Sequence, residues 1–309
     1  MSGWTRREVL TSAAGATVAG WVGRLAGQTA VKWSAGTERP RLEAPPLAAD
    51  CHHHIYDARF PPDPSATLRP PDALVDDYRA LQARLGTTRH VVVQPSTYGV
   101  DNRCLLDALA AFGATARGVA VVNDAVGDAE LARLDRLGVR GLRFNLAQAG
   151  ATTVDMIEPL ARRIHDLGWH VQVNASAARI QAILPVLDRV PVPVVFDHLA
   201  QIPEPAGVAH PLVADLRRRL DAGRIWIKLT GVYGQSRVGP PTYSDAGAVA
   251  RAYVQAAPER LVWGTDWPHP TEREKPDDAA LFDLLLDWAP DAAVRHRILV
   301  ENPAALYRF

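Results

Sequence analysis

DAELARLDRLGVRGLRFN, residues 128–145, joins an amphipathic helix directly to a short apolar strand. Leu131, Leu134 and Leu137 recur every three residues, which is the spacing of a stripe that a helix buries against a neighbour. Gly138 follows, and glycine at that point suits the left-handed backbone that commonly ends a helix. The residues after it predict a strand, so the stretch is one helix-to-strand unit of an α/β fold.

The same alternation of amphipathic stretches and short apolar runs continues on both sides of this unit. Several of the apolar runs are rich in Val and Ile throughout, which is typical of parallel strands covered on both faces. Strands are predicted over Asp50–Tyr56, His90–Gln94, Gly118–Val122, Gly141–Asn145, His170–Asn174, Val192–Asp197, Ile225–Thr230 and Leu261–Thr265. Helices are predicted over Pro71–Leu85, Asn102–Phe112, Asp128–Leu137, Val154–Leu167 and Pro211–Asp221.

Eight strands separated by helical connections predict one closed parallel barrel, the (β/α)8 or TIM barrel. A doubly wound open sheet would show the same alternation of strands and helices. Its dinucleotide-binding version is disfavoured because no Gly-x-Gly-x-x-Gly follows the first strand. We therefore assign residues 41–309 to a single catalytic barrel domain, close to the usual barrel length of about 250 residues.

The first forty residues predict an export leader and linker outside the barrel. Thr5-Arg6-Arg7-Glu8-Val9-Leu10 resembles the twin-arginine export motif, and an Ala/Gly-rich stretch from Ala13 to Gly23 follows it. That stretch is too short for a stable membrane helix, so we expect no integral membrane segment after removal of the leader. The predicted localisation is periplasmic or secreted. A disordered N-terminus with a chance arginine pair is the alternative.

The charge balance excludes one class of partner. The 309 residues carry 34 Lys and Arg against 34 Asp and Glu, and the basic residues are dispersed. No nucleic-acid partner is expected, because no cationic excess exists to neutralise a phosphate backbone. Cys51 and Cys104 lack a zinc-type spacing, and a disulfide between them is disfavoured. The oligomeric state stays open, and a homo-oligomer is possible.

Polar residues at the carboxyl ends of the strands are the candidates for chemistry, because barrel active sites assemble at that face. His52 and His54 lie two residues apart on the first strand, so they point to one side while His53 points to the other. His198 follows the sixth strand and Asp266 the eighth. The imidazoles can polarise a carbonyl or hold a metal, and the carboxylate can take a proton from water. Structural histidines and a loop-capping Asp266 are the plainer alternatives.

Together these stretches resemble the amidohydrolase-related group that includes 2-pyrone-4,6-dicarboxylate hydrolase, sulfomuconolactone hydrolase, D-galactarolactone isomerase and sugar lactonases. The resemblance runs from about Asp50 to Phe309. The motifs that carry it are DCHHH at 50–54, VQPSTYG at 93–99, GLRFN at 141–145, DH at 197–198, WGTDWPH at 263–269 and ENP at 301–303. It implies a metal-dependent-hydrolase-like barrel and an enzyme that acts on a small lactone.

The resemblance implies roles for four residues. His52, His54 and His198 would hold and polarise the lactone carbonyl and stabilise the oxyanion formed on attack. Asp266 would be the general base that activates water and later protonates the leaving oxygen. We expect no cofactor, since the pyrone-hydrolase branch is metal-independent. Zn²⁺ bound by the same three imidazoles and Asp266 is the alternative. A two-metal site is disfavoured, because the fourth strand lacks a bridging lysine.

Substrate contacts are predicted at five further positions. Arg143 ends the fourth strand, where its guanidinium can clamp a carboxylate; a structural ion pair is the alternative. Ser96 and Tyr98 follow the second strand and can donate hydrogen bonds to the same carboxylate, or pack in their loop. Asn145 and Asn174 end the fourth and fifth strands, as donors or as turn formers.

Two departures from the pyrone hydrolase narrow the expected substrate. The resemblance implies that the pyrone hydrolase binds the two carboxylates of its substrate with several arginines and a tyrosine on the fifth strand. Here the fifth strand ends in Asn174, the loop after the seventh strand carries Gln235, and Arg237 helps only if its loop folds inward. We therefore expect a lactone with one carboxylate or a hydroxylated chain.

Hydrolysis of a lactone is the leading functional hypothesis. A lactone isomerase would use the same residues to move an acyl group between two hydroxyls, without releasing a proton. A zinc-dependent decarboxylase and an exported solute-binding barrel without activity are further alternatives. Release of a proton, release of CO₂ and sensitivity to chelators discriminate among them.

Overall fold

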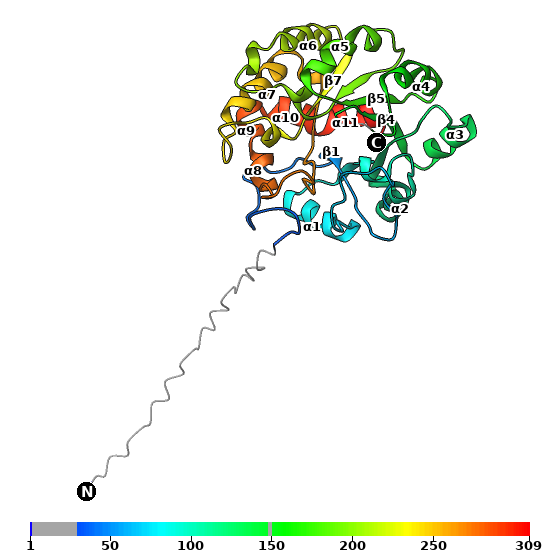
Figure 1. Ribbon diagram of the computed structural model, residues 1–309. Helices are drawn as coiled ribbons and strands as arrows, with labels where there is room; N and C mark the ends of the chain where they lie inside the picture. The colour runs from blue at the N-terminus through cyan, green and yellow to red at the C-terminus, as the bar shows by residue number, and fades with distance from the viewer. Residues whose placement is uncertain (2–29, 148–149) are drawn as a thin grey trace.

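A computed structural model describes Met1, residues 30–147 and residues 150–309 of the chain. Within it, eight parallel strands follow one another in chain order around a barrel, and helices surround them (Figure 1). The strands are β1 (Ala49–His53), β2 (Arg89–Val93), β3 (Ala116–Ala120), β4 (Val139–Asn145), β5 (His170–Asn174), β6 (Val194–Phe196), β7 (Ile225–Leu229) and β8 (Leu261–Trp263). The predicted (β/α)8 barrel is confirmed.

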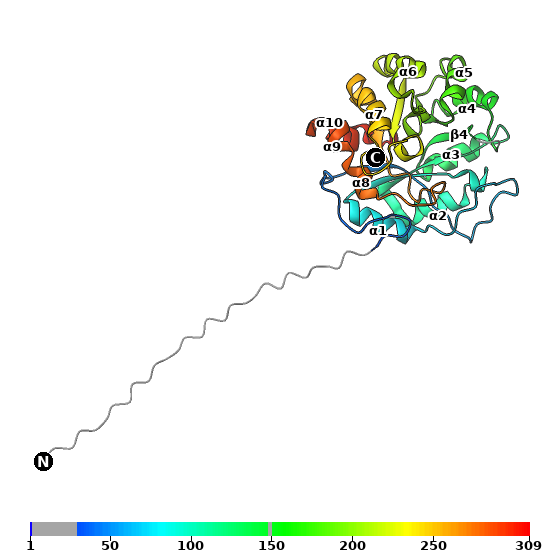
Figure 2. The same ribbon diagram turned by 60° about the vertical axis from the view of Figure 1, so that its left-hand side comes forward.

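The α-helices alternate with the strands and form the outer layer, which Figure 2 shows from a second side. They are α1 (Val75–Leu85), α2 (Arg103–Phe112), α3 (Asp128–Arg136), α4 (Ile157–Ile164), α5 (Ala177–Leu187), α6 (Pro211–Asp221), α7 (Ser244–Ala256), α8 (Asp278–Asp283), α9 (Leu285–Trp288), α10 (Ala292–His296) and α11 (Asn302–Tyr307). Gly138, the glycine expected to end a helix, has a positive φ of 96°, and Gly86 directly after α1 has one of 82°.

Hydrophobic packing divides into two regions. The larger core lies between the strands and the surrounding helices. A smaller core fills the barrel itself, where Cys51, Val91 and Val262 pack beneath Leu306 and Tyr307 of the C-terminal helix α11. That helix therefore closes one end of the barrel (Figure 1) and leaves the other end for the site. Cys51 and Cys104 are buried free thiols.

The barrel closes between its last and first strands through Asp50. Its carboxylate accepts hydrogen bonds from the backbone N–H and the hydroxyl of Thr265, at 3.0 and 2.7 Å. Tyr78 donates a further bond to it at 2.9 Å. Burial nevertheless raises the pKa of Asp50 to about 6, because the charged form has lost its water. These bonds fix the chain that follows β8 against β1, which positions the candidate site residues His52, His54 and Asp266 relative to one another.

Residues 31–42 pack against the barrel, ahead of the boundary predicted at residue 41. Val31 and Leu42 are buried, and the indole N–H of Trp33 donates to the carbonyl of Asp72 at 2.9 Å. The guanidinium of Arg84 donates to the carbonyl of Glu38 at 2.7 Å. The linker part of the predicted 1–40 segment thus contributes contacts to the folded body, whereas the arginine motif at 5–10 lies outside the described residues.

Several predicted strands are longer than those observed. β1 ends at His53 rather than Tyr56, β6 at Phe196 rather than Asp197, and β8 at Trp263 rather than Thr265. In each case the chain leaves the sheet just before or at the polar residues that enter the site. The spacing of apolar residues does not reveal where a strand ends, because it depends on which side chains are buried and not on which backbone groups pair in the sheet.

None of the helices in the described part of the chain combines the length and apolarity that a membrane span requires.

Candidate active site

A cavity of about 360 Å³ lies at the carboxyl ends of the strands, and we call it the catalytic chamber. Its polar wall includes the side chains of His54, Arg143, Asn145, Asn174, His198, Gln201, Tyr233, Gln235, Asp266 and Glu272. Three of the four predicted catalytic residues therefore line one cavity. The fourth, His52, is fully buried directly behind Asp266.

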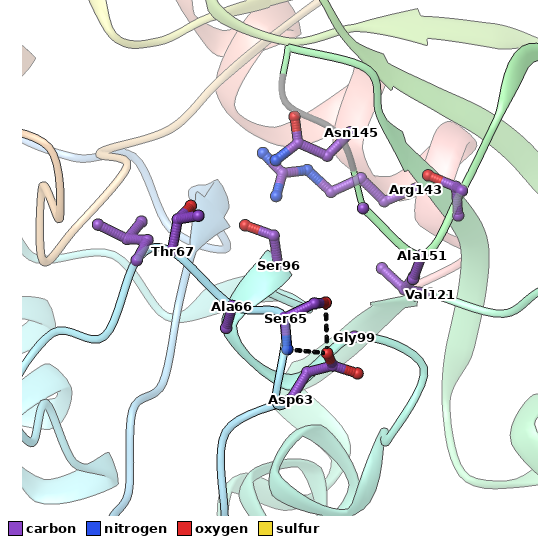
Figure 3. Close-up of a pocket in the computed structure, with 13 residues that line it drawn as sticks. Asp63, Ser65, Ala66, Thr67, Ser96, Gly99, Val121, Arg143, Asn145 and Ala151 are labelled. Atoms are coloured by element: carbon purple, nitrogen blue, oxygen red, sulfur yellow. Dashed lines mark hydrogen bonds between the residues drawn. The ribbon is translucent and has the colours of Figure 1, made fainter.

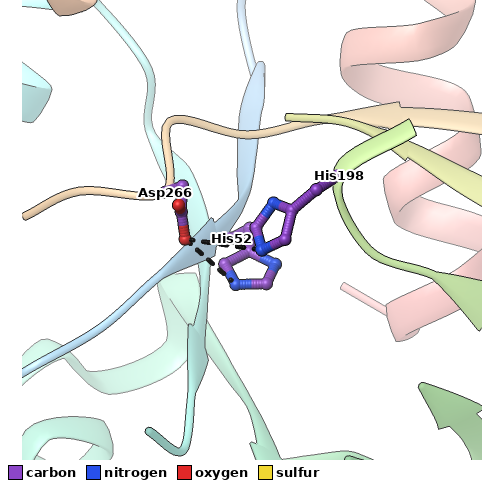
Figure 4. A group of neighbouring side chains, drawn as sticks. All are labelled: His52, His198 and Asp266. Atoms are coloured by element: carbon purple, nitrogen blue, oxygen red, sulfur yellow. Dashed lines mark ion pairs between the residues drawn. The ribbon is translucent and has the colours of Figure 1, made fainter. Parts of the chain in front are cut away.

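Asp266 is the point at which the imidazoles converge. Its Oδ1 lies 3.4 Å from Nε2 of His52, 3.4 Å from Nε2 of His54 and 3.9 Å from Nε2 of His198. Figure 4 shows Asp266 facing the His52 and His198 rings, which come from separate segments of the barrel. Although burial opposes charge, the facing imidazoles hold the pKa of Asp266 well below its usual range. Asp266 is therefore a carboxylate at neutral pH.

His198 reaches the chamber from an unusual left-handed turn. The four consecutive residues His198–Gln201 have φ of 52°, 54°, 58° and 49°, a region that non-glycine residues rarely enter. Thr230 holds the turn, because its Oγ1 lies 3.2 Å from the backbone N and 2.9 Å from Nδ1 of His198. Since this oxygen accepts from the backbone N–H, its own hydrogen is available for Nδ1. When Thr230 donates to Nδ1, Nε2 of His198 carries the ring hydrogen and faces Asp266.

Gly231 makes room for the His198 ring. It has a φ of 62°, and a Cβ at this position would lie 2.7 Å from Nδ1 of His198. Both the backbone angle and the contact require glycine here. The loop after β6 places the His198 imidazole in the chamber, and Gly231 in the loop after β7 leaves the space that this ring occupies.

Lys228 lies beneath His52 and orients its ring. Its ammonium donates to the carbonyl of Cys51 at 2.8 Å and lies 3.2 Å from Nδ1 of His52. Burial lowers the pKa of Lys228 to about 8, so it is still mostly charged at neutral pH and can only donate. Nδ1 of His52 also lies 3.3 Å from Oδ1 of Asp197, which can only accept, so its two neighbours favour opposite tautomers, while Nε2 is the ring nitrogen that faces Asp266. Burial, with the charge of Lys228, holds the pKa of His52 well below its usual range.

A backbone carbonyl orients the His54 ring. Its Nδ1 lies 2.7 Å from the carbonyl of Val93, which can only accept a hydrogen bond, so Nδ1 carries a hydrogen. Burial lowers the pKa of His54 and favours the neutral ring. Nε2 of His54 is then an acceptor that faces the chamber beside Oδ1 of Asp266. A water molecule could donate one hydrogen to each of these two atoms.

The second carboxylate oxygen of Asp266 binds Tyr233. The phenol donates to Oδ2 at 2.6 Å and also lies 2.9 Å from Nδ1 of His269. Nε2 of His269 lies 3.1 and 3.2 Å from the two oxygens of Asp278, which like His269 is fully buried. Burial and the nearby Asp266 charge raise the pKa of Tyr233 well above its ordinary value, so it remains a phenol.

Arg143 is both ion-paired and open to the chamber. Its Nε donates to Oδ2 of Asp197 at 3.1 Å, and its side chain also lines the chamber. The neighbouring His52 imidazole and the positive charges of Arg143 and Lys228 hold the pKa of Asp197 well below its usual range despite burial. One edge of the guanidinium is therefore engaged in the barrel, which leaves part of the fork for a substrate carboxylate.

The two predicted amide side chains, Asn145 and Asn174, form a connected row with Gln201, which was not predicted. Gln201 donates to Oδ1 of Asn174, whose Nδ2 donates to Oδ1 of Asn145 at 3.1 Å. All three line the catalytic chamber. Gln201 belongs to the left-handed turn, so the row links that turn to β4 and β5.

Ser96 and Tyr98 have different positions. Ser96 lines the chamber, whereas the Tyr98 hydroxyl accepts from the backbone N–H of Asp57 at 2.8 Å and donates to its carbonyl at 3.3 Å. Tyr98 is absent from the described residues around the chamber. The Tyr98 hydroxyl therefore holds the loop after β1, and its contact with substrate stays a prediction.

A second cavity of about 440 Å³ adjoins the first, and we call it the side chamber. The two share Leu68, Ser96, Arg143 and Asn145. Figure 3 shows Arg143 and Ser96 at this junction, with small residues such as Ala66 and Ala151 farther along the wall. Arg143 is the sole Arg or Lys among the described residues that line either chamber.

Three of the residues proposed as zinc ligands can meet at one point. Donor atoms of His52, His198 and Asp266 all lie within 4.8 Å of one another. Nε2 of His52 is buried and has no hydrogen-bond partner among the described residues, as a metal-ligating nitrogen would be. Two imidazoles and a carboxylate suit Zn²⁺. His54 adjoins this group but is not part of it.

A parallel barrel that gathers imidazoles from its first and sixth strand ends around a carboxylate after its eighth defines an amidohydrolase-type enzyme. The chain belongs to the amidohydrolase family, whose pattern it matches over residues 49–309.

Known relatives agree with this membership. The chain is 35% identical over 288 residues to 2-pyrone-4,6-dicarboxylate hydrolase of Comamonas testosteroni, covering 89% of this chain and 94% of that protein. It is 35% identical over 274 residues to D-galactarolactone isomerase of Agrobacterium fabrum, covering 87% and 94%. A solved apo structure from Agrobacterium tumefaciens superposes with a TM-score of 0.83 at 34% identity, covering 90% and 99%. The relatives include enzymes that open lactones and one that isomerises them.

Proposed function

We propose that this protein is a hydrolase that opens a small lactone by adding water across its ester bond. The observation that carries the proposal is the ionised Asp266, whose Oδ1 faces three imidazole nitrogens at the wall of one chamber. The named lactone hydrolase among the relatives supports the same reaction class.

The orientation of each ring suggests its part in the reaction. The attacking water would donate one hydrogen to Oδ1 of Asp266 and the other to Nε2 of His54. His198 would donate from Nε2 to the carbonyl oxygen and stabilise the charge that develops there. His52, buried behind Asp266, would orient the carboxylate and would not touch the lactone. This differs from the expectation that all three imidazoles polarise the carbonyl.

The bond changes then balance. Water oxygen bonds to the carbonyl carbon while Asp266 takes its proton, and the carbonyl electron pair moves to the oxygen. When that pair returns, the ring C–O bond breaks and Asp266 gives the proton to the leaving oxygen. The product is an open hydroxy acid, which ionises at neutral pH and releases one proton for each turnover.

The chambers favour a substrate with one carboxylate. Arg143 can bind one anionic group, whereas Asp266 and Glu272 make a second anion unfavourable in the catalytic chamber. In the side chamber, hydrogen bonds from Ser65 lower the pKa of Asp63 and keep it ionised. An uncharged substituent of the lactone would therefore occupy the side chamber.

Zinc remains compatible with the donor set. His52, His198 and Asp266 would hold the ion, and bound Zn²⁺ would supply a Lewis acid for the carbonyl. We propose the metal-free form, because the buried ammonium of Lys228 lies 3.2 Å from Nδ1 of His52 and would repel a second cation at that imidazole.

A pH-indicator assay on purified protein tests the function. A panel of monocarboxylated and neutral sugar lactones should include at least one that releases a proton on turnover. Asp266→Asn should lower kcat by about 1,000-fold or more while retaining affinity for that lactone. Failure of every lactone to release a proton would overturn the proposal. Conversion of one lactone into another without proton release would support isomerisation, which the isomerase relative keeps as the second candidate.

We further propose export to the periplasm by the twin-arginine route, from the motif at residues 5–10. The double substitution Arg6→Lys and Arg7→Lys should keep the full-length protein in the cytoplasm, as measured by cell fractionation. Unchanged export of that variant would contradict the proposal.

A further inference from the structure

A line of four polar side chains runs from the proposed general base into the barrel wall. Asp266 Oδ2 lies 2.6 Å from the Tyr233 hydroxyl, which lies 2.9 Å from Nδ1 of His269. Nε2 of His269 lies 3.1 Å from Oδ1 of Asp278, the first residue of α8. His269 and Asp278 have no exposed surface, so solvent cannot replace these bonds.

Counting hydrogens shows how the line is arranged. The Tyr233 hydroxyl has one hydrogen and two neighbours that could accept it, Asp266 and His269. The Asp278 carboxylate accepts from Nε2 of His269. All three contacts are hydrogen bonds at once only if Nδ1 of His269 also carries a hydrogen and donates it to the Tyr233 oxygen. The Tyr233 hydrogen then points at Asp266.

The geometry points to Tyr233 as the positioning residue for Asp266, and we propose that Asp278 acts through His269 to direct the Tyr233 hydrogen to Oδ2. This inference rests on the proposed function. With Oδ2 engaged, Oδ1 is the carboxylate oxygen that faces His54 and the water it would hold. A hydrogen bond to a carboxylate in a site of low dielectric is strong, so the carboxylate plane is fixed before substrate arrives.

Asp278 separates this positioning role from direct substrate contact. Tyr233 lines the catalytic chamber, so its loss could also weaken substrate binding. Asp278 is fully buried and is absent from the described residues around both chambers. Side-chain hydrogen bonds connect Asp278 to Asp266 through His269 and Tyr233.

The test compares Tyr233→Phe, Asp278→Asn and the double variant on the lactone that the wild-type enzyme turns over. Each single change should lower kcat by about 10- to 100-fold, since a misplaced base loses that much. Asp278→Asn should leave KM within about threefold. The double variant should be no slower than Tyr233→Phe alone, because both changes interrupt one line.

Asp277→Asn is the matched control. Asp277 precedes Asp278, caps α8 by accepting from Ala279 at 3.0 Å and pairs with Arg84 at 2.6 Å, outside the line. It should lower Tm without lowering kcat. Multiplied losses in the double variant, or wild-type kcat in Asp278→Asn, would overturn the inference.

A second readout does not need activity. In ¹⁵N spectra of the histidine rings, His269 should show hydrogens on both nitrogens in the wild-type protein, with His269→Gln identifying its signals among ten histidines. Asp278→Asn should leave one ring nitrogen bare. A wild-type His269 whose Nδ1 carries no hydrogen would overturn the inference. This result does not depend on activity, so it is separate from a failure of the proposed function, which would show as no hydrolysis of any lactone.

Discussion

Nε2 of His52 lies 3.4 Å from Oδ1 of Asp266, although one residue belongs to the first strand and the other follows the last. Their backbones are also joined, because the N–H of Asp266 donates to the carbonyl of His52 at 2.7 Å. Closure of the barrel is therefore what assembles the proposed catalytic pair. A partly opened barrel would lose both the carboxylate position and the imidazole that orients it.

Gly231→Ala should lower kcat/KM by about 100-fold. The added Cβ would lie 2.7 Å from Nδ1 of His198 and would displace the ring from the chamber, and the positive φ adds backbone strain. Steady-state kinetics of this variant should be compared with Gly234→Ala, which alters the same loop. Gly234 also lines the catalytic chamber, where its Cβ would meet no protein atom within 4 Å, so its kcat/KM should fall by no more than about tenfold. Equal losses of kcat/KM in the two variants would show that the loss in Gly231→Ala does not come from displacement of the His198 ring.

Removal of divalent metal should leave lactone hydrolysis unchanged. The ammonium of Lys228 lies 3.2 Å from Nδ1 of His52, so a buried positive charge already lies beside the imidazole that a metal would need. Activity should be measured after exhaustive dialysis against a chelator, with metal content determined on the same sample. Loss of activity that added Zn²⁺ restores would establish the alternative, with His52, His198 and Asp266 as ligands.

Ala66→Phe should discriminate between two lactones that differ only in an uncharged substituent. Ala66 lines the side chamber, so the added ring should raise KM for the substituted lactone by about tenfold and spare the unsubstituted one. Ala147→Phe is the control, because Ala147 lines the catalytic chamber and its change should impair both substrates. If Ala66→Phe impairs both lactones equally, the side chamber does not hold the substituent.

Lys228→Met should alter how stability depends on pH. Burial lowers the pKa of Lys228 from 10.5 to about 8, so the folded protein binds fewer protons than the unfolded chain between these values. The unfolding free energy therefore rises with pH across that window, and the destabilisation is fully present below pH 8. Relative to the variant, the wild-type protein should gain about 2 kcal/mol from pH 8 to pH 10 in denaturant titrations. Parallel stability curves for the two proteins would contradict the assigned shift.

Much of the site follows from local sequence pattern combined with one rule of barrels. Apolar runs located the eight strands, and the rule that strand ends face one mouth brought His54, His198 and Asp266 together. The alternation of strand side chains also separated His53, which stacks on Tyr78 at 3.5 Å between ring centroids, from its two neighbours. These features depend on periodicity, which a sequence contains directly.

The residues that orient the catalytic groups have no such signal. Lys228 is the single charged residue in the otherwise apolar strand β7. Only the alternation of side chains along the strand indicates that it points into the barrel. Tyr233, His269 and Asp278 lie in loops or at a helix start, and their contact depends on how separate segments cross. The left-handed turn at His198–Gln201 contains no glycine to indicate positive φ. Proximity along the chain also did not reveal that the Tyr98 hydroxyl binds the Asp57 backbone.

The indole N–H of Trp267 donates to the carbonyl of Lys32 at 2.8 Å, and Trp267 directly follows Asp266. A recombinant version trimmed to begin at residue 41 would delete this acceptor and leave the indole without its bond beside the general base. Expression plasmids should therefore retain the chain from residue 30, and affinity tags belong ahead of that point.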